Sequence, residues 1–452
     1  MNGVFLRAFV AAVLIAGVAA TAAVALPEYP AELFLPSTSC GCHGGLVAQW
    51  EQSMHAKALD DPLYLHKLEK ANAETDGAIG PFCETCHGAV AAMAGELDGR
   101  AFSPQGGEGV TCTLCHQTTG RQEGRIGNTS IVVNPDGTMR AQFDDAVSPF
   151  HDSAFSAFHS SAEFCGSCHN VFHPVNGLDL ESTYTEWSEG PYAAEGIVCQ
   201  DCHMTPGPGV TKPNPGRAAA GGPERPHIYT MTFAGGNVGL GDAALAEERL
   251  QAAAQIDLEV PEIVGGGGTI PAVVRITNIG AGHYLPTGLT DFRRMWLEVT
   301  ATGPDGTETL IGKREFHTVF SDAEGNSPAD VWNAVAVESD DRIPPREYVE
   351  DVWDATMPAE GPLTLNATLY YRSCTEEFAE EAGVEIPTTT MASVTKAVYT
   401  SQEEAAAAER VTGGSDGGNT MLLAMLIAGL VVIVATVLFF AIRSRSSSGG
   451  VA

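Results

Sequence analysis

The sequence predicts a chain in three parts: a loop-rich N-terminal region with only short helices, an antiparallel β-sandwich, and one C-terminal transmembrane helix. Three observations lead to this fold class. Cysteine–histidine clusters are confined to residues 38–235, where Gly and Pro are frequent and aromatic residues are few. Apolar and polar residues alternate over much of residues 256–400, and an uncharged apolar run covers residues 421–442.

Ten of the eleven cysteines form five short clusters, and each cluster ends in Cys-His. Four clusters fit the pattern C-x-x-C-H, at Cys83–His87, Cys112–His116, Cys165–His169 and Cys199–His203. This is the attachment pattern of c-type haem, in which two thiols add to the haem vinyl groups and the next residue binds the iron. A CxxC pair alone would also suit a zinc ribbon, a redox dithiol, an iron–sulfur cluster or a disulfide. None of these requires the histidine that follows here each time, so we predict four haems.

The first cluster, Cys40-Gly41-Cys42-His43, has a shorter bridge, with Ser39 standing where the first cysteine would be expected. The alternatives are two thioethers, a single thioether to Cys42, a haemless remnant of a motif, or a disulfide. We expect a fifth haem here, because residues downstream fit a haem context. The predicted attachment residues are Cys40, Cys42, Cys83, Cys86, Cys112, Cys115, Cys165, Cys168, Cys199 and Cys202, and the predicted proximal ligands are His43, His87, His116, His169 and His203.

The other eight histidines are candidates for the second axial ligands, and most of them lie within or next to the haem segment. An iron held by two imidazoles has no open position, so such a haem passes electrons rather than binding a substrate. The predicted distal ligands are His55, His151, His159, His173, His227 and His283.

The rest of the chain divides by composition. We expect a multihaem domain at residues 38–235, a connecting helix and linker at residues 236–255, a β-sandwich at residues 256–400 and a stalk at residues 401–420. In the sandwich, Ile256, Leu258 and Val260 illustrate the alternation, which has period two. Cys374 lies there without a partner cysteine and is expected to be an inert thiol.

The two ends of the sequence predict export and anchoring. Residues 1–25 resemble a signal peptide, with Arg7, an apolar run and a small-residue cleavage site, although an uncleaved anchor is the alternative. Residues 421–442 are long enough to span a bilayer, and Arg443 and Arg445 would place the tail at residues 443–452 in the cytoplasm. The prediction is a single-pass protein of the cell membrane with its haem and β domains outside the cytoplasm.

The net charge of −32, from 56 acidic and 24 basic residues, argues against a nucleic-acid partner. It suits a solvated acidic surface. The partners we expect are other redox proteins or extracellular electron acceptors.

Several stretches resemble the cytochrome c-552/c-554 family of multihaem cytochromes. One is Trp50 with Ser53-Met54-His55-Ala56 after the first Cys-His cluster, and others run over residues 148–174 and 195–204. The latter are similar to the subunits of extracellular cytochrome filaments. The turn at residues 282–288, followed by Arg293-Arg294, resembles a β-domain appended to multihaem cytochromes.

The resemblance implies a close-packed chain of bis-His haems that moves electrons across the outside of the cell. In the filament relatives a neighbouring subunit supplies one distal histidine, so the resemblance also implies self-assembly with inter-subunit histidine ligation. The short first cluster and the predicted membrane anchor depart from those relatives. A tethered conduit or a filament base fits them better than a free fibre.

The function we predict is electron transfer along four to five mostly bis-His haems, rather than enzymatic turnover. The alternative is a reductase or oxidase of a small nitrogen or sulfur oxyanion that uses the atypical first haem. No C-x-x-C-K motif is present to mark an open iron. A third interpretation, in which the sandwich binds a partner and the haems are secondary, is disfavoured by the number of haem motifs.

Overall fold

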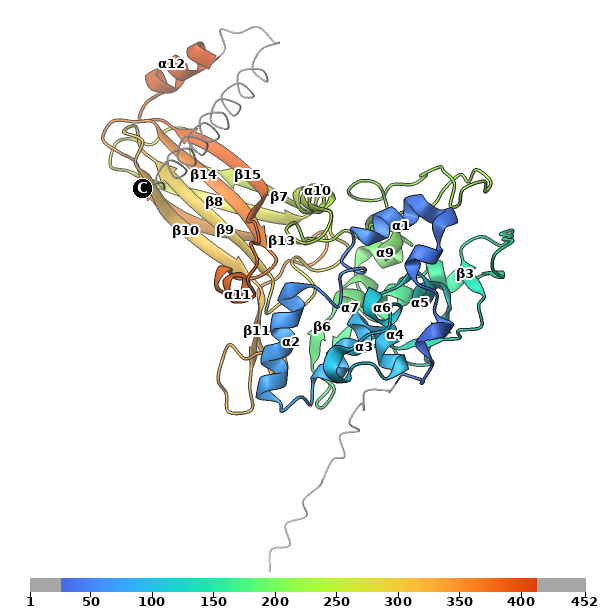
Figure 1. Cartoon of the computed structure of the whole chain (residues 1–452). Coiled ribbons are helices and arrows are strands. Elements are labelled where there is room, and N and C mark those ends of the chain that lie inside the picture. Colours follow the sequence, from blue (N-terminus) through green and yellow to red (C-terminus); the bar gives the residue numbers. More distant parts are fainter. Residues whose placement is uncertain (1–25, 413–452) are drawn as a thin grey trace, which may run out of the picture.

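The computed structural model describes residues 26–412, which form two regions side by side (Figure 1). The haem motifs lie in one region, drawn in blue to green, and the other, drawn in yellow to red, consists mainly of long strands. Helix α10 (Ala243–Ala253) lies where the two regions meet and continues directly into strand β7 (Ala254–Glu259). Within residues 26–412, no helix is long and apolar enough to cross a membrane.

The haem-motif region is built from short elements. Its α-helices are α1 (Gly44–Glu51), α2 (Pro62–Glu74), α3 (Gly80–His87), α4 (Ala89–Ala94), α5 (Cys112–His116), α6 (Ala162–Gly166), α7 (Thr183–Ser188), α8 (Pro191–Ala194) and α9 (Cys199–His203). Its strands pair two by two: β1 (Thr118–Arg121) with β2 (Ile131–Val133), β3 (Met139–Ala141) with β4 (Ser153–Phe155), and β5 (Val171–Phe172) with β6 (Asp179–Glu181).

Helix α2, the longest of this region, has clear local causes. Asp61 precedes it and accepts a hydrogen bond from the Leu63 backbone N–H at 2.9 Å, which caps the first turn. Pro62 occupies the first position, where its missing N–H costs nothing. The buried residues Leu63, Leu68 and Ala71 recur with helical spacing and give the helix one apolar face.

The sheet-rich region contains two main antiparallel sheets that share one core, as in a β-sandwich. One has the order β10-β9-β14-β15 and the other β13-β8-β7, with a separate pair β11-β12. The further strands are β8 (Thr269–Asn278), β9 (Arg294–Thr302), β10 (Glu308–Phe316), β11 (Thr318–Ser321), β12 (Ala336–Asp340), β13 (Tyr348–Thr356), β14 (Leu363–Arg372) and β15 (Thr389–Val398), and the short helix α11 (Glu376–Glu381) precedes β15.

The period-two pattern explains this core. On β9 every second residue is buried, and the inward-facing Leu297 pairs with Leu369 of β14 across the ladder. Both side chains are fully buried. Burial of a large aliphatic side chain contributes about 1.5–3 kcal/mol, so the alternating strands stabilise this region strongly.

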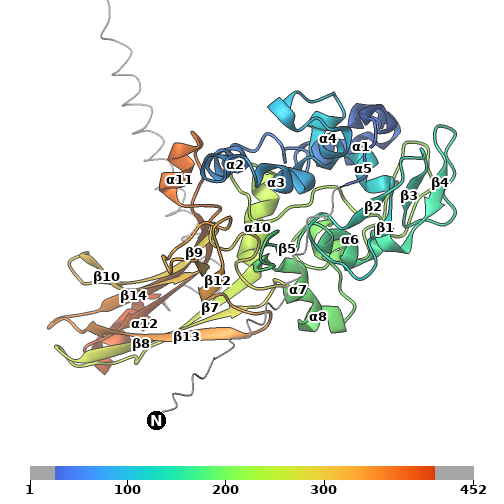
Figure 2. The ribbon, with the colours of Figure 1, turned by 90° about the horizontal axis from the view of Figure 1, so that it is seen from below.

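The two regions contact each other over several elements. Leu63 of α2 packs with Ala379 of α11 and with the fully buried Cys374. The Trp332 indole donates a hydrogen bond to the Glu74 carboxylate at 2.7 Å. Figure 2 places α7 and α8 on the side of the haem-motif region that faces the long strands, with β3 and β4 at the opposite edge.

The two regions follow the sequence prediction: short helices surround the haem motifs, and a sheet-rich region follows. The connecting helix corresponds to α10, and part of the predicted stalk is helix α12 (Gln402–Thr412). The predicted signal peptide at residues 1–25 and the predicted transmembrane helix at residues 421–442 lie outside the described residues.

Candidate haem sites

The four CxxCH motifs are helical, which puts their reactive atoms on one side. In α3, α5 and α9 the two cysteines and the histidine occupy positions i, i+3 and i+4 of a helix. Side chains at these positions share a face. The motif that begins at Cys165 has the same geometry, because the His169 N–H donates to the Cys165 carbonyl at 2.9 Å. Two thiols and one imidazole can therefore meet a single haem.

The first cluster is wound more tightly. Residues Gly41–His43 form a 3₁₀ helix, and the His43 N–H bonds to the Cys40 carbonyl at 2.8 Å. With three residues per turn, Cys40 lies directly above His43, and Cys42 is exposed. The tighter helix thus partly offsets the missing residue of the bridge for Cys40.

Each of the five proximal histidines has its Nδ1 atom engaged by the protein. In four of them Nδ1–H donates to a backbone carbonyl: His43 to Ala218 at 2.7 Å, His87 to Ala58 at 3.0 Å, His116 to Arg140 at 2.8 Å and His203 to Ala234 at 2.8 Å. Such bonds fix the tautomer and orientation of a metal-binding imidazole and leave Nε2 for the iron.

His169 is the exception, because its Nδ1 faces the Glu181 carboxylate at 3.4 Å. Burial opposes the charged form of His169, but the hydrogen bond and charge of Glu181 outweigh it and raise the pKa of this imidazole. A carboxylate partner makes an imidazole a more basic ligand than a carbonyl partner does.

Four of the proximal rings stand opposite a second histidine ring. Two imidazoles bound to opposite sides of one metal by bonds of about 2.0 Å have ring centroids about 6 Å apart. The observed centroid distances are 6.3 Å for His43–His151, 5.9 Å for His116–His159, 6.2 Å for His169–His55 and 6.2 Å for His203–His283. This donor set fits four bis-His haems.

Burial keeps several of these rings neutral, which is the form that binds iron. It lowers the pKa of His55 to about 3 and the pKa values of His159 and His203 to about 4, with smaller contributions from neighbouring histidines. In His159, Nε2 bonds to the Cys115 carbonyl at 2.9 Å, and Nδ1 is the ring nitrogen without a partner among the described residues.

The His87 site differs. Within residues 26–412, which include all thirteen histidines, no second imidazole is paired with His87. Instead the Tyr64 ring stacks face to face on it, with centroids 3.7 Å apart and planes 7° apart. That distance is too short for an iron between the rings, so Tyr64 packs on the proximal ligand. Tyr64 could not be found from the sequence, because no local pattern relates it to His87, which lies 23 residues further along the chain.

Neighbouring motifs touch through their cysteines. The sulfur atoms of Cys40 and Cys112 lie close enough to shift each other's pKa values, as do those of Cys86 and Cys168 and those of Cys165 and Cys199. Motif one therefore lies beside motif three, and motif four lies beside both two and five. The Cys115 thiol contributes electrostatically to the raised pKa values of Cys165 and Cys168, behind hydrogen bonding and burial, which puts motif three close to motif four.

Comparisons with known proteins agree with this geometry. Residues 39–117 match the family described as cytochrome c554 and c-prime. The fold is similar to the penta-heme cytochrome c552 from Thermochromatium tepidum, with a TM-score of 0.58 and 21% identity over 82% of this chain and 99% of that chain. The chain is a multihaem c-type cytochrome.

The similarity to the penta-heme protein covers more of this cytochrome than its haem-motif region alone, so it extends into the sheet-rich region. The CARDB domain of the PF1109 protein from Pyrococcus furiosus matches 32% of this chain and 85% of its own at 17% identity. Its TM-score of 0.19 is too low to indicate a shared fold. No curated protein sequence matches the chain.

Two predicted distal ligands of this cytochrome take other places. His173 is buried, and both its ring nitrogens are used: Nε2 bonds to the Trp332 carbonyl at 3.1 Å and Nδ1 accepts from the Val175 N–H at 3.2 Å. It connects the two regions. The Nδ1 of His227 accepts from the Asn214 N–H at 3.0 Å, and its ring packs against Tyr229. Neither ring is paired with a proximal histidine, because each is engaged by other groups of the protein.

Proposed function

We propose that this cytochrome is a membrane-anchored, extracytoplasmic electron carrier with five haems, four of them closed by two histidines. The observation that carries the proposal is the set of four imidazole pairs with centroids 5.9–6.3 Å apart. A closed iron exchanges electrons without binding a substrate. The acidic surface and the apolar run at residues 421–442 support a tethered carrier that donates to, or accepts from, other redox proteins or extracellular acceptors.

The contacts between motifs support an order for the haems in space. Shared cysteine contacts favour the order one, three, four, five, with the second haem beside the fourth. This order differs from the order in the sequence. Electrons would then cross from the β3–β4 side, where His151 lies, towards the side that faces the sheet-rich region.

Mass spectrometry and electron paramagnetic resonance of the mature protein test this proposal together. The mass counts the covalently bound haems and fixes the mature N-terminus. We expect five haems and a spectrum in which four are low-spin. A mass that corresponds to fewer than four haems, or a high-spin signal from most of them, would overturn the proposal.

A second candidate function is the binding and reduction of a small nitrogen or sulfur oxyanion at the second haem. The sequence pointed to the atypical first haem for this chemistry, but His43 of that cluster is paired with His151. His87 lacks such a partner among the described residues, which favours the second haem instead.

The number of carbon monoxide molecules bound per chain distinguishes an open iron at the first haem from one at the second haem. The reduced wild-type protein is expected to bind it at one haem. His151→Ala should then open the first haem and add one carbon monoxide per chain. An unchanged stoichiometry in His151→Ala would mean that the first haem was the open one from the start. No binding of nitrite or hydroxylamine to the wild type would remove the enzymatic candidate.

A further inference from the structure

The haem at His203 takes its second imidazole from the other region of the molecule. His283 lies in the loop between β8 and β9 of the sheet-rich region, 6.2 Å from the His203 ring between centroids. The partners of the other three pairs, His55, His151 and His159, belong to the haem-motif region itself. Ligation of this one iron therefore depends on how the sheet-rich region docks.

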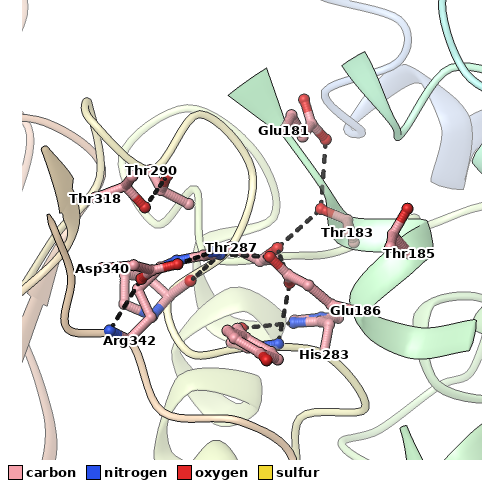
Figure 3. Close-up of polar contacts among 12 residues, drawn as sticks. Glu181, Thr183, Thr185, Glu186, His283, Thr287, Thr290, Thr318, Asp340 and Arg342 are labelled. Atoms are coloured by element: carbon pink, nitrogen blue, oxygen red, sulfur yellow. Dashed lines mark hydrogen bonds and ion pairs between the residues drawn. The ribbon is translucent and has the colours of Figure 1, made fainter. Parts of the chain in front are cut away.

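One carboxylate of the haem-motif region holds the loop that carries His283. Glu186 of α7 accepts hydrogen bonds from the Tyr284 backbone N–H at 3.0 Å and from the Thr287 hydroxyl at 2.7 Å (Figure 3). Both residues belong to the same loop and follow His283 by one and four positions. Because Glu186 bonds to the backbone of the adjacent residue, it constrains the position of the histidine directly.

Arg342 completes the clamp from the sheet-rich side. Its guanidinium forms an ion pair with Glu186, two hydrogen bonds of 2.8 Å with Asp340, and one of 3.4 Å with the Pro286 carbonyl. The side chains of Arg342 and Glu186 are only 8% and 4% exposed. Breaking a buried pair leaves an uncompensated charge, which is strongly unfavourable, so the two groups hold each other in place.

The loop has one more attachment beside this pair. Leu285 and Ile343 exchange backbone hydrogen bonds of 3.0 Å in both directions, which ties the His283 loop to the segment that carries Arg342. The His283 loop is thus held between α7 on one side and the β12–β13 connection on the other.

We propose that Glu186 and Arg342 are positioning residues that set His283 as the sixth ligand of the haem bound at Cys199, Cys202 and His203. Docking of the sheet-rich region then closes this iron. The inference rests on the proposed bis-His ligation of the fifth haem and adds the groups that enforce it. The sheet-rich region accordingly supplies one haem ligand, besides supporting the haem-motif region.

The test compares five full-length, haem-loaded variants by electron paramagnetic resonance and carbon monoxide stoichiometry. His283→Ala removes the ligand, and it should add one high-spin haem and one bound carbon monoxide per chain. Arg342→Ala should add a fraction of the same signal. In the double variant the gain should equal that of His283→Ala alone, since Arg342 acts through His283.

Arg346→Ala is the matched control. Arg346 also bridges the two regions, through an ion pair with Glu195, but both side chains are exposed by 44–46%, and neither side chain hydrogen-bonds to residues 283–287 of the described chain. Its loss should leave the spin state unchanged. Arg342→Lys should recover part of the low-spin signal, because it restores the positive charge without the planar fork.

The outcomes separate the inference from the function on which it rests. If His283→Ala opens no iron, the proposed bis-His ligation of the fifth haem is wrong. If His283→Ala opens the iron but Arg342→Ala does not, the ligation stands and the positioning role is overturned. If Arg342→Ala fails to assemble, Thr287→Val replaces it, since it removes the hydroxyl's bonds to Glu186 and Thr183 and keeps the ion pair. A spin state identical to wild type would then count against the proposal.

Discussion

The four paired haem sites and the His87 site differ in one respect that local sequence does not reveal. All five proximal histidines follow a second cysteine and have Nδ1 held by the protein. Four of them face a second imidazole, and His87 is instead covered on its ring face by Tyr64. The motif thus determines which residues can attach a haem, whereas the surrounding fold determines whether a second imidazole faces the proximal one.

The largest effect should come from turning a paired site into one that resembles the His87 site. His159→Ala removes the ring opposite His116. We expect one additional high-spin haem and one additional carbon monoxide per chain, measured by resonance spectroscopy and titration of the reduced protein. The control is His317→Ala, which removes a histidine that is paired with no proximal ring. A response to the control equal to that of His159→Ala would contradict the pairing.

A second effect concerns pH. Burial lowers the pKa values of His55, His159 and His203 below the ordinary value of 6.5, so the unfolded chain binds protons there that the folded chain does not. Stability should therefore be fully present above about pH 6.5 and fall as the pH is lowered towards the folded values. We expect Tm, measured by calorimetry, to decrease as the pH is lowered from about 7 to about 5. A Tm that rises over this interval would contradict the neutral, buried state of these rings.

A smaller effect, on the reduction potential, should distinguish the His169 site from the other three paired sites. Glu181→Gln removes the negative charge beside Nδ1 of His169, and no other proximal histidine has a carboxylate at this place. The oxidised iron is then less stabilised, so the reduction potential of this haem should rise by an amount on the order of tens of millivolts. Spectroelectrochemical titration measures it. Glu189→Gln, an equal change of charge on an exposed side chain, should leave the potential nearly unchanged.

The smallest effect is expected at Tyr64 itself. Tyr64→Phe keeps the ring that stacks on His87 and removes only the hydroxyl. The absorption spectrum and the carbon monoxide stoichiometry should match those of the wild type. Loss of a charge-transfer band, or a change in the spin state of one haem, would show that the tyrosine oxygen binds iron and that the His87 site is closed in another way.

The sequence by itself determined the cofactor type and the division into two regions, and it predicts the attachment residues. The spacing of two thiols and an imidazole is a local property, and one helical turn is enough to bring them to one haem. The alternation of apolar residues is equally local, and it placed Leu297 and its neighbours in the core of the sheets.

Only the tertiary structure decided which histidines face each other. His55 follows the first motif by twelve residues, yet it stands opposite His169 of the fourth, and His283 reaches the fifth motif from the other region. His173 lies next to the fourth motif but bonds to Trp332. Proximity along the chain fails here because a second axial ligand must lie across an iron, and that position is set by the packing of distant segments such as the Glu186–Arg342 clamp.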